Sequence, residues 1–73
     1  MTNTNTSGIY TNRLREIRKS RRISQAKLAK TGGVSRECIR NIENGKSAPS
    51  VYLAIVISKT FGMNVEDIFR VSG

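Results

Sequence analysis

Two short segments, ISQAKLA at residues 23–29 and VSRECI at residues 34–39, limit the fold of this chain more than any other feature. In each, a serine follows one apolar residue and precedes another at the fourth position of the expected helix. The residues in these places are Ile23, Ser24 and Leu28 in the first segment and Val34, Ser35 and Ile39 in the second. Serine caps helix N-termini, and apolar residues so placed pack together as a hydrophobic staple. The pattern predicts two helices that start eleven residues apart, with a tight connection at Gly33, where glycine tolerates a positive φ.

Three further helices are predicted around this pair. Leu14 and Ile17 share one face of a helix over about residues 10–21. Residues 50–61 contain β-branched side chains that suit a buried strand, but their length, the serine before them and the glycine after them favour a helix. A last short helix over residues 65–69 is capped by the asparagine before it. The expected fold is all-α, a compact domain of five helices.

The size of the chain limits its organisation to one small domain. The 73 residues are expected to form a disordered polar tail at residues 1–8 and a folded domain at residues 9–70. Cys38 is the only cysteine, which excludes a disulfide within the chain and favours a reducing cytosol. No apolar run is long enough to span a bilayer, and the uncharged N-terminus does not resemble a signal peptide.

An enzymatic function is poorly supported. The chain has no histidine, and Cys38 therefore lacks a base and is interpreted as a small core residue. Glu66 and Asp67 are adjacent, so that on a helix they point about 100° apart, and capping explains them better than acid–base chemistry. The glycine clusters lack phosphate-loop spacing. We expect no cofactor, no metal and no small-molecule ligand.

The positive charge is concentrated in one part of the chain. The sequence carries 13 Lys and Arg against 5 Asp and Glu, a net charge of +8. Residues 13–46 hold eleven of the basic residues and three of the acids, whereas the charges of residues 47–73 balance. Simple solubilising charge is an alternative, but it is more often interspersed with acids. The distribution favours a nucleic-acid-binding protein.

The helix expected after Ser35 has the side chains of a base-reading surface. At about 100° per residue, its polar residues fall on one arc and its apolar residues on the other. The polar arc contains Arg36, Glu37, Arg40, Asn41 and Asn44. Arginine pairs with guanine, asparagine with adenine and glutamate with cytosine. The alternative is a merely solvated face, which would favour Lys and Glu over short amides and would not place two arginines four residues apart.

Residues 12–69 resemble the Cro and phage-repressor (xenobiotic-response-element) type of helix-turn-helix regulator. The matching segments are NRLREIRKSRRISQAKLA, GVSRECIRNIENGK, PSVYLAIVISKTFG and VEDIF. Their combination is far more specific than any one of them. The resemblance implies a lambda-repressor-like five-helix domain with its motif at about residues 24–44. Residues 25–31 would form the first motif helix and residues 36–44 the recognition helix.

The resemblance also implies roles for individual residues. Gln25 matches a contact to backbone phosphate, and Asn44 and Lys46 match loop contacts to phosphate. The full set expected to bind double-stranded DNA is Ser24, Gln25, Ser35, Arg36, Glu37, Arg40, Asn41, Asn44 and Lys46. Arg18 and Glu43 match an internal ion pair between the first helix and the end of the third. Glu37 has two interpretations that stay open, a contact to cytosine and stabilisation of the helix N-terminus.

Three positions depart from the family pattern. Gly32 stands where an apolar residue is usual, which predicts a looser turn. Arg22 replaces a frequent glycine before Ile23, which places a bulky residue in a glycine-type conformation or reshapes the bend. Lys27 occupies the place of a capping-box glutamate, which leaves half of that box.

The C-terminal helices bear on the oligomeric state. If Val51 faces the core together with Ala54, Ile57 and Phe61, the remaining apolar residues exceed what a monomer of this size needs. These residues are Tyr52, Ile55, Val56, Ile68 and Phe69. They are expected to form a two-fold interface that places two recognition helices about 34 Å apart. The alternative is an apolar core helix without an interface.

The sequence therefore predicts a homodimeric DNA-binding transcriptional regulator, a repressor that occludes a promoter. A controller of a restriction–modification operon and a DNA-binding antitoxin are alternatives within this class. An RNA-binding or protein-interaction module that uses the basic face of the first helix is the alternative from another class.

Overall fold

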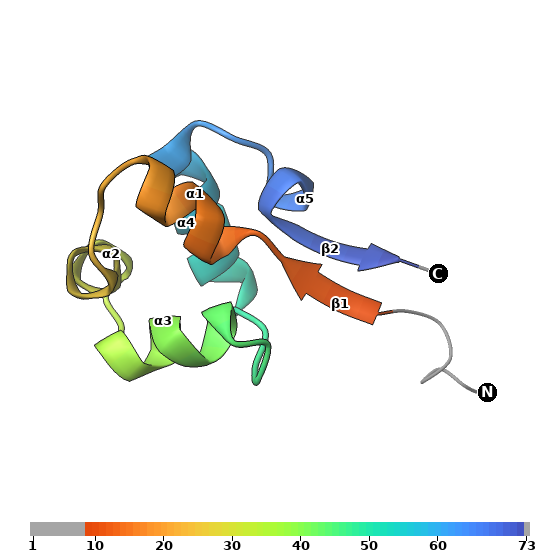
Figure 1. The fold of residues 1–73 in the computed structure, drawn as a ribbon, viewed down its shortest axis with the longest axis horizontal. Helices are drawn as coiled ribbons and strands as arrows, with labels where there is room; N and C mark the ends of the chain where they lie inside the picture. The colour runs from red at the N-terminus through yellow and green to blue at the C-terminus, as the bar shows by residue number, and fades with distance from the viewer. Residues whose placement is uncertain (1–8, 73) are drawn as a thin grey trace.

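A computed structural model describes residues 9–72 of the protein, and the tail expected at residues 1–8 lies outside the described residues. Five helices and two short strands make up the fold (Figure 1). They are β1 (Ile9–Asn12), α1 (Leu14–Ser20), α2 (Gln25–Gly32), α3 (Arg36–Glu43), α4 (Val51–Phe61), α5 (Val65–Ile68) and β2 (Phe69–Ser72). The predicted five-helix domain is confirmed. None of the helices in the described part of the chain is long and apolar enough to cross a membrane.

Each helix contributes to a single apolar core. The largest side chains that are fully buried come from all five helices: Leu14, Leu28, Ile39, Ile42, Ile57 and Ile68. Isolated helices shorter than about 12 residues are at best marginally stable in water, so the core holds these helices in place. It thereby fixes the orientation of α2 and α3, the two helices of the predicted motif.

The helix boundaries follow the predicted caps. The hydroxyl oxygens of Ser24, Ser35 and Ser50 each accept a hydrogen bond from a backbone N–H three residues later, at 3.0–3.1 Å. Gly33 ends α2 with a φ of 72°, and Gly62 ends α4 with a φ of 66°. Glycine adopts this left-handed conformation without steric cost. Local sequence signals therefore determine where α2, α3 and α4 begin and where α2 and α4 end.

The strands were not predicted. The first helix was expected from about residue 10, but residues 9–12 pair antiparallel with residues 69–72, with Tyr10 opposite Val71. Asn12 ends β1: its side-chain oxygen accepts a hydrogen bond from the backbone N–H of Leu14, and its amide N–H donates to the carbonyl oxygen of Ile42. The first helix therefore starts only at Leu14, because this pairing takes up the residues before it.

The expected exposure of the C-terminal residues is wrong in three places. Val51 was expected to face the core, but its side chain is 78% exposed. The buried face of α4 begins at Leu53, so that the first residues of the helix extend beyond the core. Ile68 and Phe69 were expected on the surface but are 0% and 9% exposed, since the end of α5 and the start of β2 close the core. Phe69 belongs to β2 rather than to the last helix.

The segment between α1 and α3 shows the effect of two unusual residues. Arg22 has a φ of 58°, so the bend keeps its glycine-type conformation with an arginine in it. Gly32 does not loosen the turn, because Leu53 of α4 occupies the space beside it. A Cβ added at Gly32 would lie 2.6 Å from Cδ1 of Leu53. The missing side chain of α2 is thus replaced by a side chain of α4.

Candidate nucleic-acid interface

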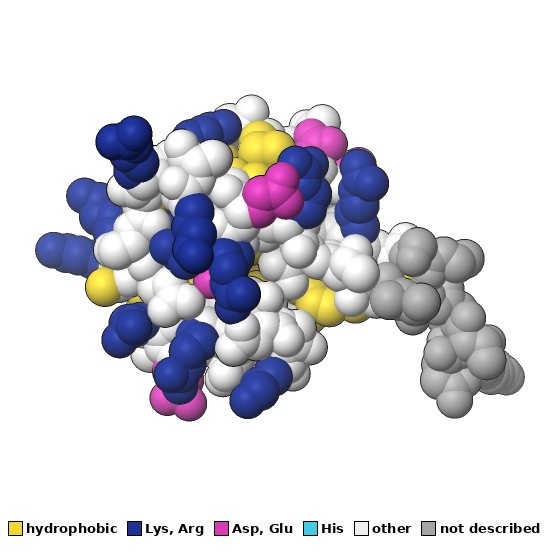
Figure 2. All heavy atoms as spheres, viewed as in Figure 1, with side chains coloured by type: hydrophobic (Ala, Val, Ile, Leu, Met, Phe, Trp, Pro, Cys, Tyr) yellow, Lys and Arg dark blue, Asp and Glu magenta, His cyan; other side chains and the backbone are white. Residues whose placement is uncertain are grey.

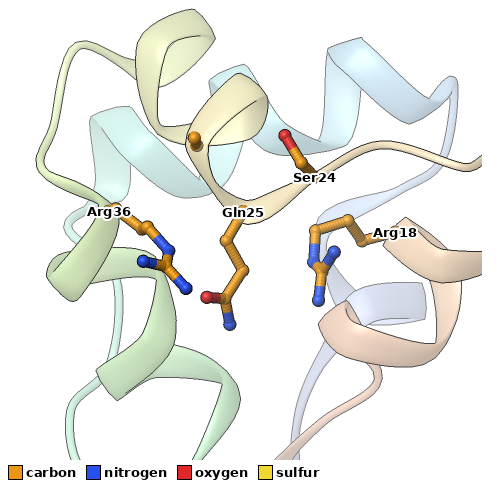
Figure 3. A pocket seen from close by; sticks show the side chains of 5 residues that line it. Arg18, Ser24, Gln25 and Arg36 are labelled. Atoms are coloured by element: carbon orange, nitrogen blue, oxygen red, sulfur yellow. The ribbon is translucent and has the colours of Figure 1, made fainter.

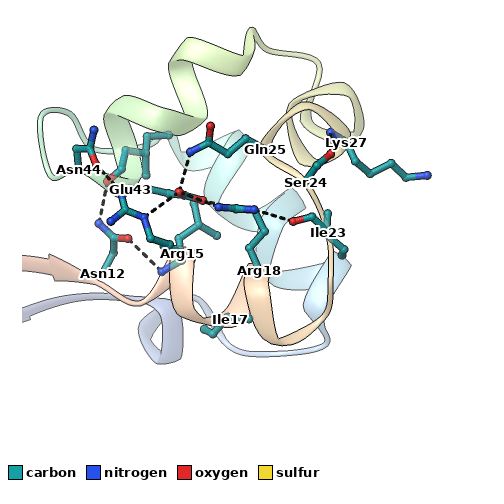
Figure 4. Close-up of polar contacts among 12 residues, drawn as sticks. Asn12, Arg15, Ile17, Arg18, Ile23, Ser24, Gln25, Lys27, Glu43 and Asn44 are labelled. Carbon is teal, nitrogen blue, oxygen red and sulfur yellow. Dashed lines mark hydrogen bonds and ion pairs between the residues drawn. The ribbon is translucent and has the colours of Figure 1, made fainter.

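Glu43, the last residue of α3, joins three helices through its carboxylate (Figure 4). Arg18 of α1 donates from Nε to Oε2 at 2.6 Å and from Nη2 to Oε1 at 3.3 Å. Gln25, the first residue of α2, donates from Nε2 to Oε1 at 3.0 Å. Arg15 of α1 adds a longer contact from Nε to Oε1 at 3.4 Å. The structure therefore brings Arg18 and Glu43 together and adds two donors to the pair.

The carboxylate is ionised in this environment. Burial by itself would raise the pKa of Glu43, since its side chain has no exposed surface. The hydrogen bonds from Arg18 and Gln25, the charge of Arg18 and the hydrogen bond from Arg15 outweigh burial, and the pKa is lowered. A buried charge that lost these partners would be costly, so the contacts of Glu43 tie α1 and α2 to the end of α3.

Two residues expected at phosphates are held by this cluster. Gln25 was expected to contact phosphate, and its amide is oriented by the bond to Glu43. A side-chain amide has two N–H groups, so Gln25 keeps one for an acceptor outside the protein, such as a phosphate oxygen. Asn44 follows α3, and its side-chain oxygen accepts a hydrogen bond from Nη2 of Arg15. Lys46 lies exposed in the next loop, where its backbone N–H donates to the carbonyl oxygen of Asn41 at 2.9 Å.

A surface hollow lies beside the N-terminus of α2. Arg18, Ser24, Gln25, Ala26 and Arg36 line it. Figure 3 shows the Gln25 side chain between Arg36 on one side and Arg18 on the other. The first backbone N–H groups of a helix and nearby arginines attract anions. The hollow therefore combines features that suit a phosphate group.

The outer face of α3 presents the residues expected to meet bases. Arg36, Glu37 and Arg40 are exposed and line a second hollow, while Asn41 is half-buried beside them. Oε2 of Glu37 lies 3.7 Å from Nη2 of Arg40, and their side chains are 69% and 54% exposed. A pair this open to solvent is weak, so both side chains are free to rearrange around a ligand. Ser24 and Ser35 are exposed at the starts of α2 and α3 as N-caps.

The surface formed by α1, α2 and α3 is strongly basic. Lys and Arg side chains outnumber acidic ones over this part of the face in view (Figure 2). Of the three acids on these helices, Glu43 is neutralised by its buried pair, and Glu16 pairs with Arg13 at 3.1 Å. The remaining acid, Glu37, lies among the arginines of α3.

Arg15 belongs to this surface but was missed by the sequence reasoning. Its side chain is 50% exposed and lies between Glu43 and Asn44. A sequence signal was present, because Arg15 and Arg18 are three residues apart and so share a helix face. If Arg18 faces the end of α3, Arg15 must lie next to it.

The comparison with known proteins agrees with this geometry. The sequence profile of the helix-turn-helix family matches residues 14–68. The chain belongs to this family. The uncharacterized HTH-type transcriptional regulator YgzD of Bacillus subtilis is 43% identical over 58 residues, 80% of this chain and 88% of YgzD. An uncharacterized HTH-type regulator of Methanocaldococcus jannaschii is 48% identical over 58 residues, with the same coverage of both chains.

Solved structures of helix-turn-helix proteins show the same fold. The P22 c2 repressor, crystallised with a synthetic operator, has a TM-score of 0.71 at 31% identity, over 74% of this chain and 82% of the repressor chain. The restriction-modification controller C.AhdI from Aeromonas hydrophila has a TM-score of 0.68 at 25% identity, over 75% of this chain and 83% of its own. This helix-turn-helix protein is a DNA-binding transcriptional regulator.

Proposed function

We propose that this protein is a transcriptional repressor that binds a pseudo-palindromic operator as a homodimer, with α3 of each copy in the major groove. An α-helix fits the major groove of B-DNA, and its N-terminal residues then lie against base edges. The likeness to the P22 c2 repressor, which was solved with operator DNA, supports this arrangement. A repressor of this kind acts by covering the promoter that contains its operator.

Sequence preference is assigned to the outer face of α3. Arg36 and Arg40 can each donate two hydrogen bonds to guanine, Asn41 pairs with adenine, and Glu37 accepts from the cytosine amino group. The surrounding positive charge offsets the repulsion between Glu37 and the phosphates. Because Glu37 and Arg40 are only loosely paired, contacts to bases can replace that pair at small cost.

Affinity for the sugar–phosphate backbone is assigned to the rim of this face. Gln25 borders the hollow at the start of α2, where one phosphate would bind. Arg15, Asn44 and Lys46 lie at the other end of α3 and would hold a phosphate further along the same strand. Two phosphate sites at opposite ends of one helix would set its position in the groove.

The observation that carries the proposal is the contrast between the two kinds of residue. Glu43 orients Gln25 directly and Arg15 by a longer contact, and Arg15 donates to Asn44, so these three groups assigned to phosphate are held before DNA binds. Among the groups assigned to bases, Arg36, Glu37 and Arg40 are exposed and Asn41 is half-buried, and none has a buried side-chain partner among residues 9–72. If the polar face of α3 only contacted solvent, fixed side chains beside exposed ones would serve no function there.

The proposal is tested by selecting bound sites from a random duplex library and measuring four alanine variants on the selected site. Glu37→Ala and Asn41→Ala should each relax the preference at particular base pairs, by about 1–3 kcal/mol. Gln25→Ala and Lys46→Ala should weaken binding to all duplexes alike. If all four variants behave identically, or if structured RNA binds as tightly as the selected duplex across salt concentrations, the proposal is wrong.

A further inference from the structure

Arg22, in the bend between α1 and α2, holds a backbone conformation that favours glycine. Its φ is 58°, and it is the only residue other than glycine with a positive φ among residues 9–72. A side chain in this left-handed region is strained, whereas glycine adopts the conformation freely. Strain of this kind is concentrated at functional sites, so an arginine in this place indicates a function beyond forming the turn.

The side chain of Arg22 has no structural role in the described part of the chain. It is exposed and forms neither an ion pair nor a side-chain hydrogen bond among residues 9–72. Arg21 beside it differs, because its Nη1 donates to the carbonyl oxygen of Phe61 at 3.2 Å and its guanidinium lies 5.5 Å from the centre of the Phe61 ring. One of these two arginines therefore packs onto α4, and the other is available to a ligand.

The bend is attached to the cluster around Glu43. Nη1 of Arg18 donates to the carbonyl oxygen of Ile23 at 2.7 Å, and the backbone N–H of Ile23 donates to the carbonyl oxygen of Arg18 at 3.1 Å. The same guanidinium binds Glu43 through Nε (Figure 4). Arg22 precedes Ile23 in the chain, so its backbone is held beside the contacts that orient Gln25.

Lys27 is a second exposed cation near this bend. It lies in the first turn of α2, which contains no acidic residue, and its backbone N–H donates to Oγ of Ser24. A positive charge in the first turn opposes the helix dipole. In Figure 4 the Lys27 side chain extends away from Glu43, and it has no ionic partner among residues 9–72. Neither Lys27 nor Arg22 lines the hollow beside Gln25.

We propose that Arg22 and Lys27 form a second phosphate-binding site, which contacts the sugar–phosphate backbone of the duplex outside the base pairs that α3 reads. This inference rests on the proposed function and extends its contacts to the flanks of the operator. Both side chains belong to the basic surface formed by α1, α2 and α3, so the site is continuous with the proposed DNA interface. Because Lys27 extends away from the end of α3, the phosphates it reaches lie beyond the one assigned to Gln25.

A bound phosphate explains why the two cations stand where they do. Its negative charge would offset the unfavourable positive charge at the start of α2. Charge that only kept the protein soluble could be placed at positions without backbone strain and away from the helix N-terminus. Phosphate contacts carry no base information, so this site should add affinity without changing the preferred sequence.

Salt titrations with two duplexes test the site. One is the selected operator trimmed to its specified base pairs, and the other adds about 10 base pairs of arbitrary sequence, one helical turn, on each side. On the longer duplex, Arg22→Asn and Lys27→Gln should each lower the slope of log affinity against log salt by about 0.9. On the trimmed duplex, both variants should match the wild type. Asparagine tolerates a positive φ, so the bend is kept, which circular dichroism verifies.

Three further variants separate a phosphate contact from a structural effect. Arg22→Lys keeps the charge and should keep the slope of the wild type. Lys59→Gln removes an exposed charge from α4, outside the basic surface, and should also keep it. Arg22→Gly should raise the urea concentration needed for unfolding and still lower the slope by about 0.9, a combination that a purely structural role for Arg22 does not produce.

The outcomes distinguish this inference from the proposed function. If Arg22→Asn and Lys27→Gln match the wild type on the longer duplex, the phosphate site is overturned, while selection of an operator by α3 stands. Equal losses on both duplexes would overturn the assignment to the flanks, and an equal loss in Lys59→Gln would reduce the effect to net charge. A wild type that selects no sequence, but binds any duplex with a slope that depends on Arg22 and Lys27, would instead overturn the proposed function and leave the phosphate site standing.

Discussion

Glu43 keeps its negative charge although no part of its side chain reaches solvent. Replacing it with glutamine removes the charge and leaves the guanidinium of Arg18, which is 9% exposed, without an ionic partner. Loss of charge-assisted hydrogen bonds of this kind costs about 2–3 kcal/mol. We expect Glu43→Gln to lower the free energy of unfolding at neutral pH by this amount, as measured by urea denaturation.

The same residue makes stability depend on pH in the acid range. The pKa of Glu43 is lowered in the folded protein, so the unfolded chain binds the proton more tightly. The stabilisation is fully present above the unfolded pKa of about 4.3 and is lost as pH falls through the lower folded value. The difference between wild type and Glu43→Gln should therefore shrink on acidification from about pH 4.5. Glu37→Gln is the control for the charge change, and if its difference from wild type shrinks equally, the effect does not arise from Glu43.

Arg22 is a second residue whose effect is local. With a φ of 58° it holds a backbone conformation that costs a residue with a side chain about 1 kcal/mol or more. Glycine at this position would remove that cost, but the glycine variant also has a larger entropy in the unfolded chain, which offsets part of the gain in stability. We expect Arg22→Gly to raise the free energy of unfolding by about 0.5–1 kcal/mol. Lys19→Gly, inside the last turn of α1, should lower it by about as much, and a stability loss in both variants would contradict the account of the bend.

Among the elements, α2 has an incomplete N-terminal cap. The Ser24 hydroxyl accepts a hydrogen bond from the backbone N–H of Lys27, but the lysine side chain has no acceptor for the backbone N–H of Ser24. Lys27→Glu would complete the capping box and place a negative charge at the positive end of the helix dipole. We expect the free energy of unfolding to rise by about 0.5–1 kcal/mol. Lys30→Glu makes the same charge change in the last turn of α2 and should destabilise the protein. Equal effects from the two variants would mean that net charge, rather than the position on the helix, determines the change in the free energy of unfolding.

Which elements could be predicted from the sequence depends on the range of the interactions that form them. The caps of α2, α3 and α4 are made within four residues, so their start positions follow from local patterns. The strand at residues 9–12 exists because residues 69–72 lie beside it, and no local pattern indicates a partner so distant. The same distance explains Ile68 and Phe69, whose burial depends on the closure of the sheet onto the core. Periodicity placed Ala54, Ile57 and Phe61 on the buried face of α4, but it does not show that the first residues of the helix extend beyond the core, and Val51 was therefore wrongly assigned to the core.

The candidate site shows the same division at the level of side chains. The residues of α3 that were assigned to bases lie on one exposed face, because helical periodicity alone places them there. Arg15 was missed, since its role depends on where the end of α3 meets α1. Gln25 was placed at the surface, but its bond to Glu43 requires three helices to be in position.

For the whole molecule, the basic residues act together on DNA through released counterions. Each phosphate that a cationic side chain neutralises on B-DNA adds about 0.9 to the slope of log affinity against log salt. Arg15 shares a carboxylate that Arg18 already neutralises, so the cluster of Arg15, Arg18 and Glu43 keeps one net positive charge toward solvent. This charge is available to a phosphate at the C-terminal end of α3.

We expect Arg15→Gln to reduce that slope by about 0.9 while the preferred base sequence stays the same. Filter binding or fluorescence anisotropy over a range of potassium chloride concentrations measures the slope. Lys59→Gln removes the same charge from α4, outside the basic face, and should leave the slope of the wild type unchanged. If Arg15→Gln and Lys59→Gln shift the slope equally, the effect comes from net charge alone. An unchanged slope for Arg15→Gln would confine Arg15 to orienting Asn44 and Glu43 within the protein.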